Sequence, residues 1–365
     1  MKAFEQAPFI VIWEVTRACE LRCRHCRAEA QPLPDPRQLS TEEGFRLLDE
    51  IKSFGSPVVV FTGGDPLMRP DLFDLIRYGV NLGLRISMTP SATPHVTKEK
   101  MRRAREAGLS RWAFSIDGST PAIHDAFRGF PGSYKVTRQA VEYLHELNLP
   151  VQINTTVSRY NLHDLERLAE LVGELKAVLW SVFFLVPTGR GQMKDMISPE
   201  EHEQVFHWLY EVAKTAPFDI KTTAAQHYRR VILQRRKEEG MDASPPRIVG
   251  VPTQPADRDG IGRAFAGVND GNGFVFISHL GDVQPSGFLP VKAGNVREAS
   301  LVELYRHSPI FRTLRNPDEY SGKCGICPYR HICGGSRARA YAITGDYTAS
   351  EPFCTFIPPG YRAHA

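Results

Sequence analysis

Short apolar segments recur along the first two thirds of the chain, and helix-like segments separate them. The segments expected to be strands are residues 9–15, 58–62, 85–89, 111–116, 151–156 and 179–186. The segments expected to be helices are residues 41–54, 71–82, 98–107, 133–147 and 161–173. Short, β-branched, apolar strands of this kind are typical of a parallel sheet that is buried on both faces. The alternation therefore predicts an α/β fold with a partial (β/α)6 barrel of the TIM type, with functional residues at the carboxyl ends of its strands.

Ser40 and Glu43 fit a capping box at the start of the first helix.

The last third of the chain has a different sequence pattern. Residues 199–236 read as helical, and residues 235–272 as a long irregular connection rich in Pro, Gly, Asp and Arg. Residues 273–277 and 282–285 resemble a hairpin, and a helix is expected near 300–315. We therefore expect a barrel at 1–215, a helical bridge with the irregular connection at 216–272, and a small C-terminal domain at 273–365.

Composition excludes several classes of function. The net charge is +4 over 365 residues, and the basic residues are spread along the chain, so no nucleic-acid partner is expected. No apolar run is long enough to span a bilayer, and the N-terminus lacks the pattern of a signal peptide. We expect a cytoplasmic protein with no membrane partner.

Seven cysteines form two groups, three near the N-terminus and four near the C-terminus. A secreted disulfide framework normally has an even number of cysteines scattered through a shorter chain. The odd total and its tight grouping favour metal or cluster ligation instead.

The first group is Cys19-x3-Cys23-x2-Cys26, directly after the first expected strand. Three thiolates cannot complete the four-cysteine ligation that is usual for a 4Fe-4S cluster, so one iron would stay open to another ligand. The alternatives are a zinc site that lacks its fourth ligand, to which His25 would add a nitrogen, and three unrelated cysteines.

The stretch from Val15 to Cys26 resembles the radical S-adenosylmethionine (SAM) superfamily in spacing and in setting. This resemblance implies that the amino and carboxylate groups of SAM bind the open iron. The second strand ends in Gly63-Gly64-Asp65, where the family has a Gly-Gly-Glu motif that contacts the SAM amino group. Glycines let backbone approach a ligand closely, although Gly-Gly-Asp is also a common turn.

Polar residues after the next strands are further candidates for SAM contacts. Ser91 is a hydrogen-bond candidate, or else a cap of the following turn. Strand alternation places Ser115 and Asp117 on one face, where they suit ribose hydroxyls, unless Asp117 only makes a turn. In the family, the serine near this point contacts SAM, and the later arginine, here Arg128, approaches its carboxylate. Asn154 is a candidate for ribose or adenine, or for a structural hydrogen bond.

The second group is Cys324-x2-Cys327-x5-Cys333-x20-Cys354, which supplies four thiolates. Four thiolates can hold a complete 4Fe-4S cluster, and zinc competes because spacing alone does not separate the two metals. The arrangement resembles the auxiliary domains called SPASM and twitch. Ser286 stands where a full SPASM domain has an upstream cysteine, so the resemblance implies the shorter form with one auxiliary cluster, and two 4Fe-4S clusters in all.

Further motifs resemble the radical SAM branch that trims tetrapyrrole side chains in heme d1 synthesis and in the siroheme-dependent heme pathway. They are Pro285-Ser-Gly-Phe-Leu-Pro290, Gly294-Asn-Val-Arg297, Cys333-Gly-Gly-Ser-Arg-Ala-Arg-Ala-Tyr-Ala342, Thr344-Gly-Asp346, Lys221-Thr-Thr and His227-Tyr-Arg-Arg230. The resemblance implies that a one-electron donor such as flavodoxin or ferredoxin starts the cleavage of SAM. A 5′-deoxyadenosyl radical then takes a hydrogen atom from a propionate side chain, which leads to loss of carbon dioxide or of the whole side chain.

A substrate that carries propionates needs cationic anchors. The candidates are Arg190, His227, Arg229, Arg230, Arg337 and Arg339. His227 is also a candidate axial ligand of a substrate iron. One alternative is a maturase that modifies a ribosomally made peptide, although only eight residues precede the first expected strand and leave no room for a peptide-binding module. A non-enzymatic cluster or zinc scaffold is the other alternative.

Overall fold

The computed structural model describes residues 4–241 and 268–362. Its strands form one sheet of ten, in the order β10-β9-β8-β1-β2-β3-β4-β5-β6-β7. The strands are β1 Ile10–Thr16, β2 Val58–Gly63, β3 Arg85–Met88, β4 Arg111–Ser115, β5 Val151–Val157, β6 Leu179–Phe184, β7 Asp219–Thr223, β8 Phe274–Ile277, β9 Asp282–Gln284 and β10 Gly294–Asn295. Neighbours from β8 through β7 are parallel, whereas β8, β9 and β10 pair antiparallel.

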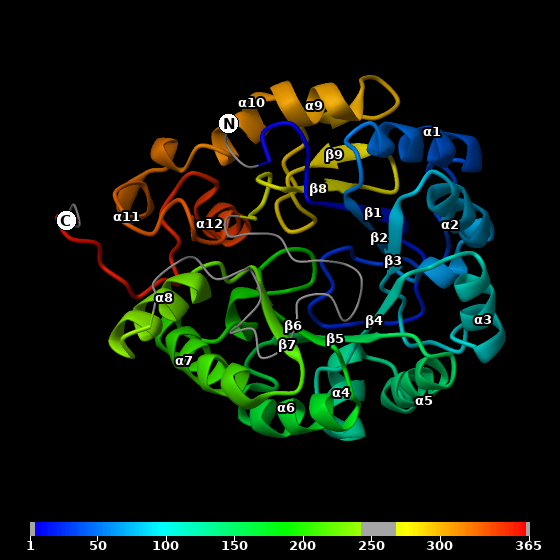
Figure 1. Ribbon diagram of the computed structural model, residues 1–365, viewed down its shortest axis with the longest axis horizontal. Coiled ribbons are helices and arrows are strands. Elements are labelled where there is room, and N and C mark those ends of the chain that lie inside the picture. The colour runs from blue at the N-terminus through cyan, green and yellow to red at the C-terminus, as the bar shows by residue number, and fades with distance from the viewer. Residues whose placement is uncertain (1–3, 242–267, 363–365) are drawn as a thin grey trace.

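Helices surround the sheet as an outer ring, which Figure 1 shows end-on. They are α1 Thr41–Lys52, α2 Leu72–Asn81, α3 Lys98–Glu106, α4 Pro121–Arg128, α5 Ser133–Glu146, α6 Leu165–Glu174, α7 Pro199–Thr215, α8 Tyr228–Glu238, α9 Leu301–His307, α10 Pro309–Leu314, α11 Gly322–Gly325 and α12 Arg337–Thr344. In the ring, α9 to α12 fill the sector between α8 and α1. The sheet itself stays open, because β7 and β10 are its two edges.

The two faces of each strand have different environments. In β5, Val151, Ile153, Thr155 and Val157 are buried, and the residues between them are only partly buried. Most of the large buried side chains of β1 to β6 belong to the main hydrophobic core under the helices, whereas the inward face carries small and polar groups such as Ser87, Ala113 and Asn154. The expectation of strands buried on both faces therefore holds only in part, since the inner face borders a cavity.

The six predicted strands and the five predicted helices are all present, and the capping box of α1 forms with both Ser40 and Glu43 in place. The prediction of helix throughout 199–236 is wrong at Asp219–Thr223, which forms β7. The sequence Asp-Ile-Lys-Thr-Thr has one large apolar residue, so it lacks the signal of a buried strand. The predicted helix near 300–315 is divided at Ser308, because the following Pro309 starts a new helix.

The predicted hairpin of β8 and β9 is present, and β8 also pairs with β1, residue Ile10 with Phe274 and Trp13 with Ile277. The C-terminal segment thus continues the barrel sheet, and the domain boundaries at 215 and 272 stay predictions. The irregular connection predicted at 235–272 begins inside α8 and otherwise falls largely on residues 242–267, outside the described part of the chain.

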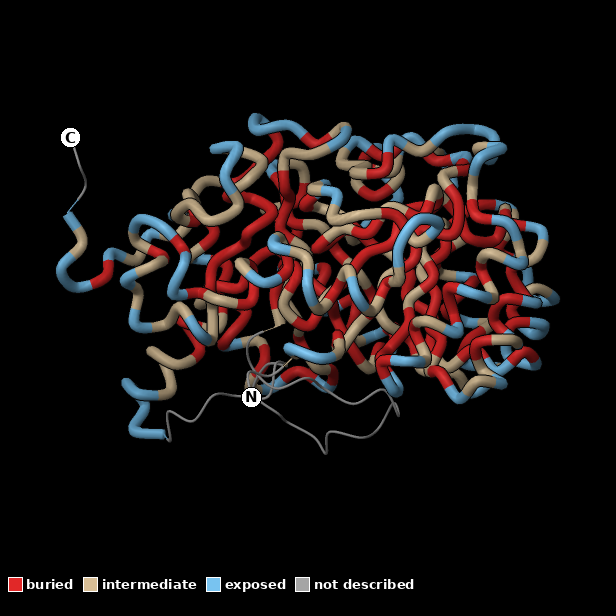
Figure 2. Tube along the Cα trace, turned by 90° about the horizontal axis from the view of Figure 1, so that it is seen from above, coloured by how far each residue is buried: buried red, intermediate tan, exposed pale blue. Residues whose placement is uncertain are grey.

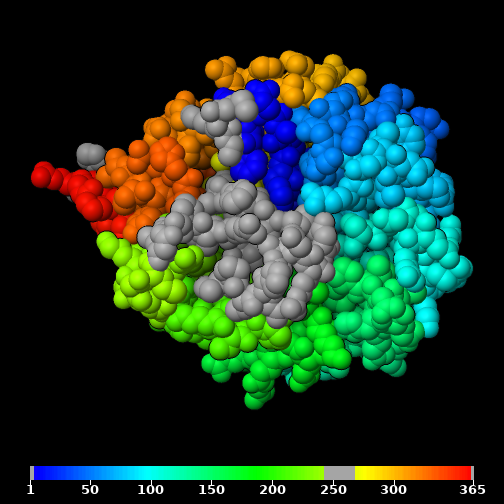
Figure 3. All heavy atoms as spheres, viewed as in Figure 1, coloured from blue at the N-terminus to red at the C-terminus, as the bar shows by residue number. Residues whose placement is uncertain are grey.

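The buried residues form a continuous band through the middle of the molecule, and exposed residues lie at its rim (Figure 2). In the space-filling view the C-terminal tail projects from the body beside the segment that contains α11 (Figure 3). No helix within residues 4–241 and 268–362 is long and apolar enough to cross a membrane.

Candidate functional site

A cavity of about 400 Å³ lies against the inner face of the sheet. It is lined by Cys19, Cys23 and Cys26 in the loop after β1. Among the predicted SAM-contacting residues, six also line it, namely Gly63, Gly64, Ser91, Ser115, Arg128 and Asn154. These residues come from four consecutive strands and the segments after them, because carboxyl ends of parallel strands meet at one edge.

The thiols of the first group have polar neighbours from later loops. The Sγ atom of Cys19 lies 3.3 Å from the Ser91 hydroxyl and accepts a hydrogen bond of 3.4 Å from the Leu21 amide. The Arg128 guanidinium lies 3.8 Å from Cys23 Sγ. Such donors are the groups that surround the sulfurs of cluster-binding cysteines and tune their charge.

Two glycines let neighbouring loops dock on the cysteine loop. Gly189, with φ of +59°, lies so close that a Cβ atom would be 2.5 Å from the Cys26 carbonyl oxygen. Gly129, at the end of α4, has φ of +61°, and a Cβ atom there would be 2.5 Å from the Arg22 carbonyl. Arg190 adds hydrogen bonds to the carbonyls of Cys23 and Cys26. The cysteine loop is thereby fixed from both sides.

The thiols of this loop fit a positively charged metal centre. Burial raises the pKa of Cys19 to about 12, against the opposing hydrogen bond from Ser91, and burial also raises the pKa of Cys23. Thiolates in such surroundings need a cation, which a bound metal ion or cluster would supply. The ring of His25 stacks on Phe127 at 4.4 Å, and burial holds the pKa of His25 well below its ordinary value.

Arg128 is held by Asp117, which is fully buried and does not line the cavity. The Asp117 carboxylate forms an ion pair with the guanidinium and accepts a hydrogen bond of 2.7 Å from the Thr156 amide. Burial alone would lower the pKa of Arg128, but Asp117 and Cys23 outweigh it and raise that pKa. Because β4 ends at Ser115, the alternation that was expected to place Asp117 beside Ser115 does not extend that far.

Asp65 also lies outside the cavity lining and is fully buried. Its carboxylate accepts hydrogen bonds from the Thr93 hydroxyl at 2.8 Å and from the Leu67 and Ser91 amides at 3.1 and 3.3 Å. Burial raises the pKa of Asp65 against these three bonds. The geometry gives Asp65 the task of holding the Ser91 loop over Cys19, and its direct contact with SAM stays a prediction.

Gly63 and Gly64 permit a close approach between the ends of β1 and β2. A Cβ atom on Gly63 would be 2.2 Å from the Thr16 carbonyl oxygen, and one on Gly64 would be 2.3 Å from that of Ala18. The glycines therefore bring the backbone of the second loop against the start of the cysteine loop, at the border of the cavity.

The six residues predicted to anchor a substrate occupy four places. Arg229 alone among them lines the large cavity. Arg190 supports the cysteine loop, as described above. Arg339 lies in a fully buried contact with Glu351 at 3.4 Å. The other three, His227, Arg230 and Arg337, lie at the second group of cysteines.

Several residues of the large cavity were not singled out from the sequence. They include Arg27, Arg111, Gln226, Asn269 and Asp270, and they line it together with Lys221, which the sequence indicated only as part of a family motif. Lys221 lies on β7, the strand that the sequence pattern did not reveal. Asn269 and Asp270 lie next to Gly271, and short runs of Asn, Asp and Gly normally indicate only a turn.

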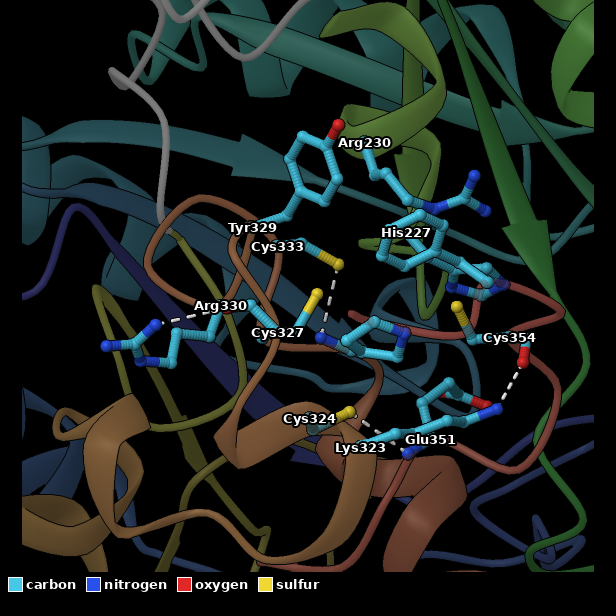
Figure 4. Close-up of a pocket in the computed structure, with 14 residues that line it drawn as sticks. His227, Arg230, Lys323, Cys324, Cys327, Tyr329, Arg330, Cys333, Glu351 and Cys354 are labelled. Carbon is cyan, nitrogen blue, oxygen red and sulfur yellow. Dashed lines mark hydrogen bonds between the residues drawn. The ribbon is translucent and has the colours of Figure 1, made fainter. Parts of the chain in front are cut away.

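The four C-terminal cysteines line a second, small cavity (Figure 4). Cys324 Sγ accepts hydrogen bonds from the Glu351 amide at 3.2 Å and from Arg337 Nη2 at 3.5 Å, and Cys333 Sγ accepts one from the Gly335 amide at 3.3 Å. Burial raises the pKa of Cys327, Cys333 and Cys354. Like the first group, these thiols fit a cationic centre.

Comparison with known proteins agrees with this geometry. The model of the radical SAM superfamily matches residues 13–172. A protein named AdoMet-dependent heme synthase from Nitratidesulfovibrio vulgaris is 44% identical over 351 residues, 96% of this chain and 92% of the relative. One of the same name from Methanosarcina barkeri is 43% identical over 358 residues, 98% of this chain and 99% of the relative.

A solved structure shares the fold. Streptococcus suis SuiB bound to S-adenosylmethionine matches with a TM-score of 0.69 at 15% identity, over 96% of this chain and 78% of that one. With the superfamily come a 4Fe-4S cluster and SAM, and the cavity beside Cys19, Cys23 and Cys26 provides for both. The chain is a radical SAM enzyme and belongs to the family of the AdoMet-dependent heme synthases.

Proposed function

We propose that this enzyme converts propionate side chains of an iron tetrapyrrole into vinyl groups by radical decarboxylation. The observation that carries the substrate class is the charge of the large cavity. Its described lining includes five cationic side chains, those of Arg27, Arg111, Arg128, Lys221 and Arg229, and one carboxylate, that of Asp270. Outside the lining, Arg27 pairs with Glu14 and Arg128 with Asp117. A cavity of this charge suits a substrate with several carboxylates, and the names of the 43–44% identical relatives support a heme precursor.

Arg229 is the residue we assign to a substrate carboxylate. Its guanidinium donates to the carbonyls of Ile332 at 3.0 Å and Val268 at 2.6 Å, and it has no carboxylate partner among the described residues. Burial lowers the pKa of Arg229 to about 10, so the group stays cationic at neutral pH. An arginine has five N–H donors, so a carboxylate can still pair with it in a charge-assisted contact.

The SAM side of the site follows from the first group of cysteines. When bound there, a 4Fe-4S cluster supplies the electron that splits SAM into methionine and a 5′-deoxyadenosyl radical. We assign Arg128, which Asp117 holds, to the SAM carboxylate, and Ser91, Ser115 and Asn154 to hydrogen bonds with the other polar groups of SAM. The hydrophobic core between the strands and the outer helices fixes the strands and loops that carry these groups.

The reaction balances with one leftover electron. The radical removes a hydrogen atom from the propionate carbon next to the ring, which gives 5′-deoxyadenosine. The substrate radical then loses CO₂ and one electron, and a vinyl group remains. A 4Fe-4S cluster on Cys324, Cys327, Cys333 and Cys354 would supply an acceptor for that electron.

The arrangement of the C-terminal thiols supports a cluster over zinc at this second site. Four zinc ligands must converge on one point at about 2.3 Å. The four C-terminal cysteines line one small cavity, in a chain whose first cysteine group belongs to a cluster-dependent family. Thiols arranged around a shared space suit a cluster, which distributes its ligands over several irons.

Anaerobic incubation with SAM, a one-electron reductant and coproheme tests the proposal. We expect 5′-deoxyadenosine together with a product lighter by CO₂ and H₂ for each side chain, read by mass spectrometry. A siroheme-derived tetrapyrrole and a set of peptides are the comparison substrates. Turnover of peptides with none of coproheme, or no SAM cleavage by the fully loaded enzyme, would refute it.

A further inference from the structure

His227 is a fully buried residue whose two ring nitrogens have no hydrogen-bond partner among residues 4–241 and 268–362. An unsatisfied buried polar group costs roughly 1–3 kcal/mol, so it normally has a partner that is not part of the chain. The residue lies at the start of α8, directly before Tyr228.

The surroundings of the ring leave one polar direction. Phe206 packs edge-on against the ring at 4.6 Å, and the His202 ring lies 6.0 Å away in a stacked arrangement. On another side, His227 lines the cavity of Cys324, Cys327, Cys333 and Cys354. Figure 4 shows the His227 ring beside the space around which the four sulfurs lie.

This position differs from the sequence-based expectation of an axial ligand to a substrate iron. His227 is absent from the lining of the large cavity, where SAM and substrate would meet. The four thiolates also complete the ligation of a cluster, so no iron needs a nitrogen from His227. What a complete cluster still accepts is a hydrogen bond to one of its sulfurs.

We propose that the His227 imidazole donates a hydrogen bond to a sulfur of the auxiliary cluster and thereby raises the reduction potential of that cluster. The inference rests on the proposed cluster at the C-terminal cysteines. An N–H donor stabilises the reduced cluster more than the oxidised one, because reduction adds negative charge to the sulfurs. His227 would thus tune the cluster that accepts the leftover electron, and a higher potential would favour that transfer.

The test uses the full chain with Cys19, Cys23 and Cys26 replaced by alanine, so that only the auxiliary site can bind a cluster. Iron and sulfide content and Mössbauer spectra first establish that the cluster is there. If this variant binds no 4Fe-4S cluster, the proposed cluster itself fails, and the role of His227 fails with it. If the cluster is present, its potential is measured by a redox titration followed by electron paramagnetic resonance.

We expect His227→Phe to lower the reduced-to-oxidised ratio of the cluster at a fixed potential about tenfold, which for one electron is ~59 mV. His202→Phe is the matched control, since His202 is equally buried and lies in the same aromatic group but does not line the cysteine cavity. The control should keep the parental potential.

Two amide variants separate a lost hydrogen bond from a merely altered fold. His227→Asn and His227→Gln each place an N–H donor near one of the two ring nitrogens, so one of them should restore the potential. An unchanged potential in His227→Phe, or an equal shift in His202→Phe, would overturn the inference. So would a strong nitrogen hyperfine coupling in the parent, because it would show that His227 binds iron directly.

Discussion

Arg128 is a residue whose side chain reaches two groups at once, the Asp117 carboxylate and the Cys23 thiol. Neither Asp117 nor its backbone partner Thr156 needs to touch SAM for this to matter, since a guanidinium is a good carboxylate binder only when its direction is fixed. In the proposed SAM site, function is therefore divided between Arg128, which would bind the carboxylate, and Asp117, which positions Arg128.

Replacing Asp117 with Asn tests that division of tasks. The amide can still accept from the Thr156 amide but no longer pairs with the Arg128 charge, so we expect SAM affinity to fall about tenfold, ~1.4 kcal/mol. Equilibrium binding of SAM to the anaerobically loaded protein measures the change. Asp74→Asn, in an exposed pair with Arg77, is the control. An unchanged affinity in Asp117→Asn would contradict the positioning role.

The role of Arg229 can be tested by comparing how its replacement changes the KM for the substrate and the cleavage of SAM. Losing a charge-assisted contact costs roughly 1.5–3 kcal/mol, so Arg229→Leu should raise the KM for coproheme about 10- to 100-fold. SAM cleavage without substrate should persist, because Arg229 does not touch the first cysteine group. Arg229→Lys should recover part of the loss. Equal KM values in the Leu variant and the parent would remove Arg229 from the substrate site.

Gly189 has no side chain, and this lets its backbone dock against the cysteine loop at Cys26. Gly189→Ala would place a Cβ atom 2.5 Å from the Cys26 carbonyl, in a conformation with φ of +59° that costs ~1–2 kcal/mol on its own. We expect less iron at the first site after anaerobic reconstitution. Gly345→Ala, with φ of +77° and no atom near the added Cβ, separates backbone strain from the clash. Equal iron loss in both variants would argue against docking through Gly189.

At the scale of elements, the sequence predicts what local pattern encodes. Apolar β-branched runs revealed β1 to β6, and Ser40 with Glu43 revealed the start of α1. The sequence pattern did not predict strand β7, because Lys221, Thr222 and Thr223 line a polar cavity and not a hydrophobic core. The part of the site lining that β7 contributes was therefore also not predicted. The pairing of β8 with β1 was also not predicted, because the alternation of apolar and polar residues defines the two faces of a strand but not its neighbouring strands.

Glu14 connects three elements through its buried carboxylate. It pairs with Arg27 at 2.9 Å and Arg17 at 3.1 Å in the cysteine loop, and with His279 at 2.9 Å in the turn between β8 and β9. Burial alone would raise its pKa, but Arg27, His279 and Arg17 together lower it to about 2 from an ordinary 4.5. The Glu14 carboxylate thereby connects the end of β1, the cysteine loop and the hairpin of β8 and β9.

Glu14→Gln should destabilise the apoprotein by roughly 3 kcal/mol at pH 7, because it leaves the largely buried Arg27 guanidinium without its carboxylate partner. A lowered pKa in the folded state means that the contribution is complete above about pH 4.5 and is lost as the pH falls toward about 2. Denaturant unfolding of parent and variant should therefore show a stability gap that narrows on acidification through this range. A gap independent of pH would show that the Glu14 charge is not its source.

At the scale of the whole molecule, the N-terminal barrel shares one sheet and its main hydrophobic core with the hairpin of β8 and β9 and the helices α9 and α10. Val275, Ile277, Leu301 and Tyr305 belong to the same core cluster as the buried residues of β1 to β6. Without β8, the inner strand β1 would become an exposed edge. The cysteine-rich segment packs on this fold through a smaller hydrophobic cluster, in which Ala338 joins Val186 and Ala224, even though its motifs read as a separate module in the sequence.

The apoprotein should accordingly unfold in one cooperative step under anaerobic reducing conditions. Tryptophan fluorescence reports the barrel, because the four tryptophans lie in β1, β4, β6 and α7, at Trp13, Trp112, Trp180 and Trp208. In a chain with Cys19, Cys23 and Cys26 replaced, the rate of thiol labelling reports the C-terminal segment. A shared core requires the two probes to give the same denaturant midpoint, within error. Labelling that begins at a lower denaturant concentration, while fluorescence stays native, would instead establish an independent domain after residue 272.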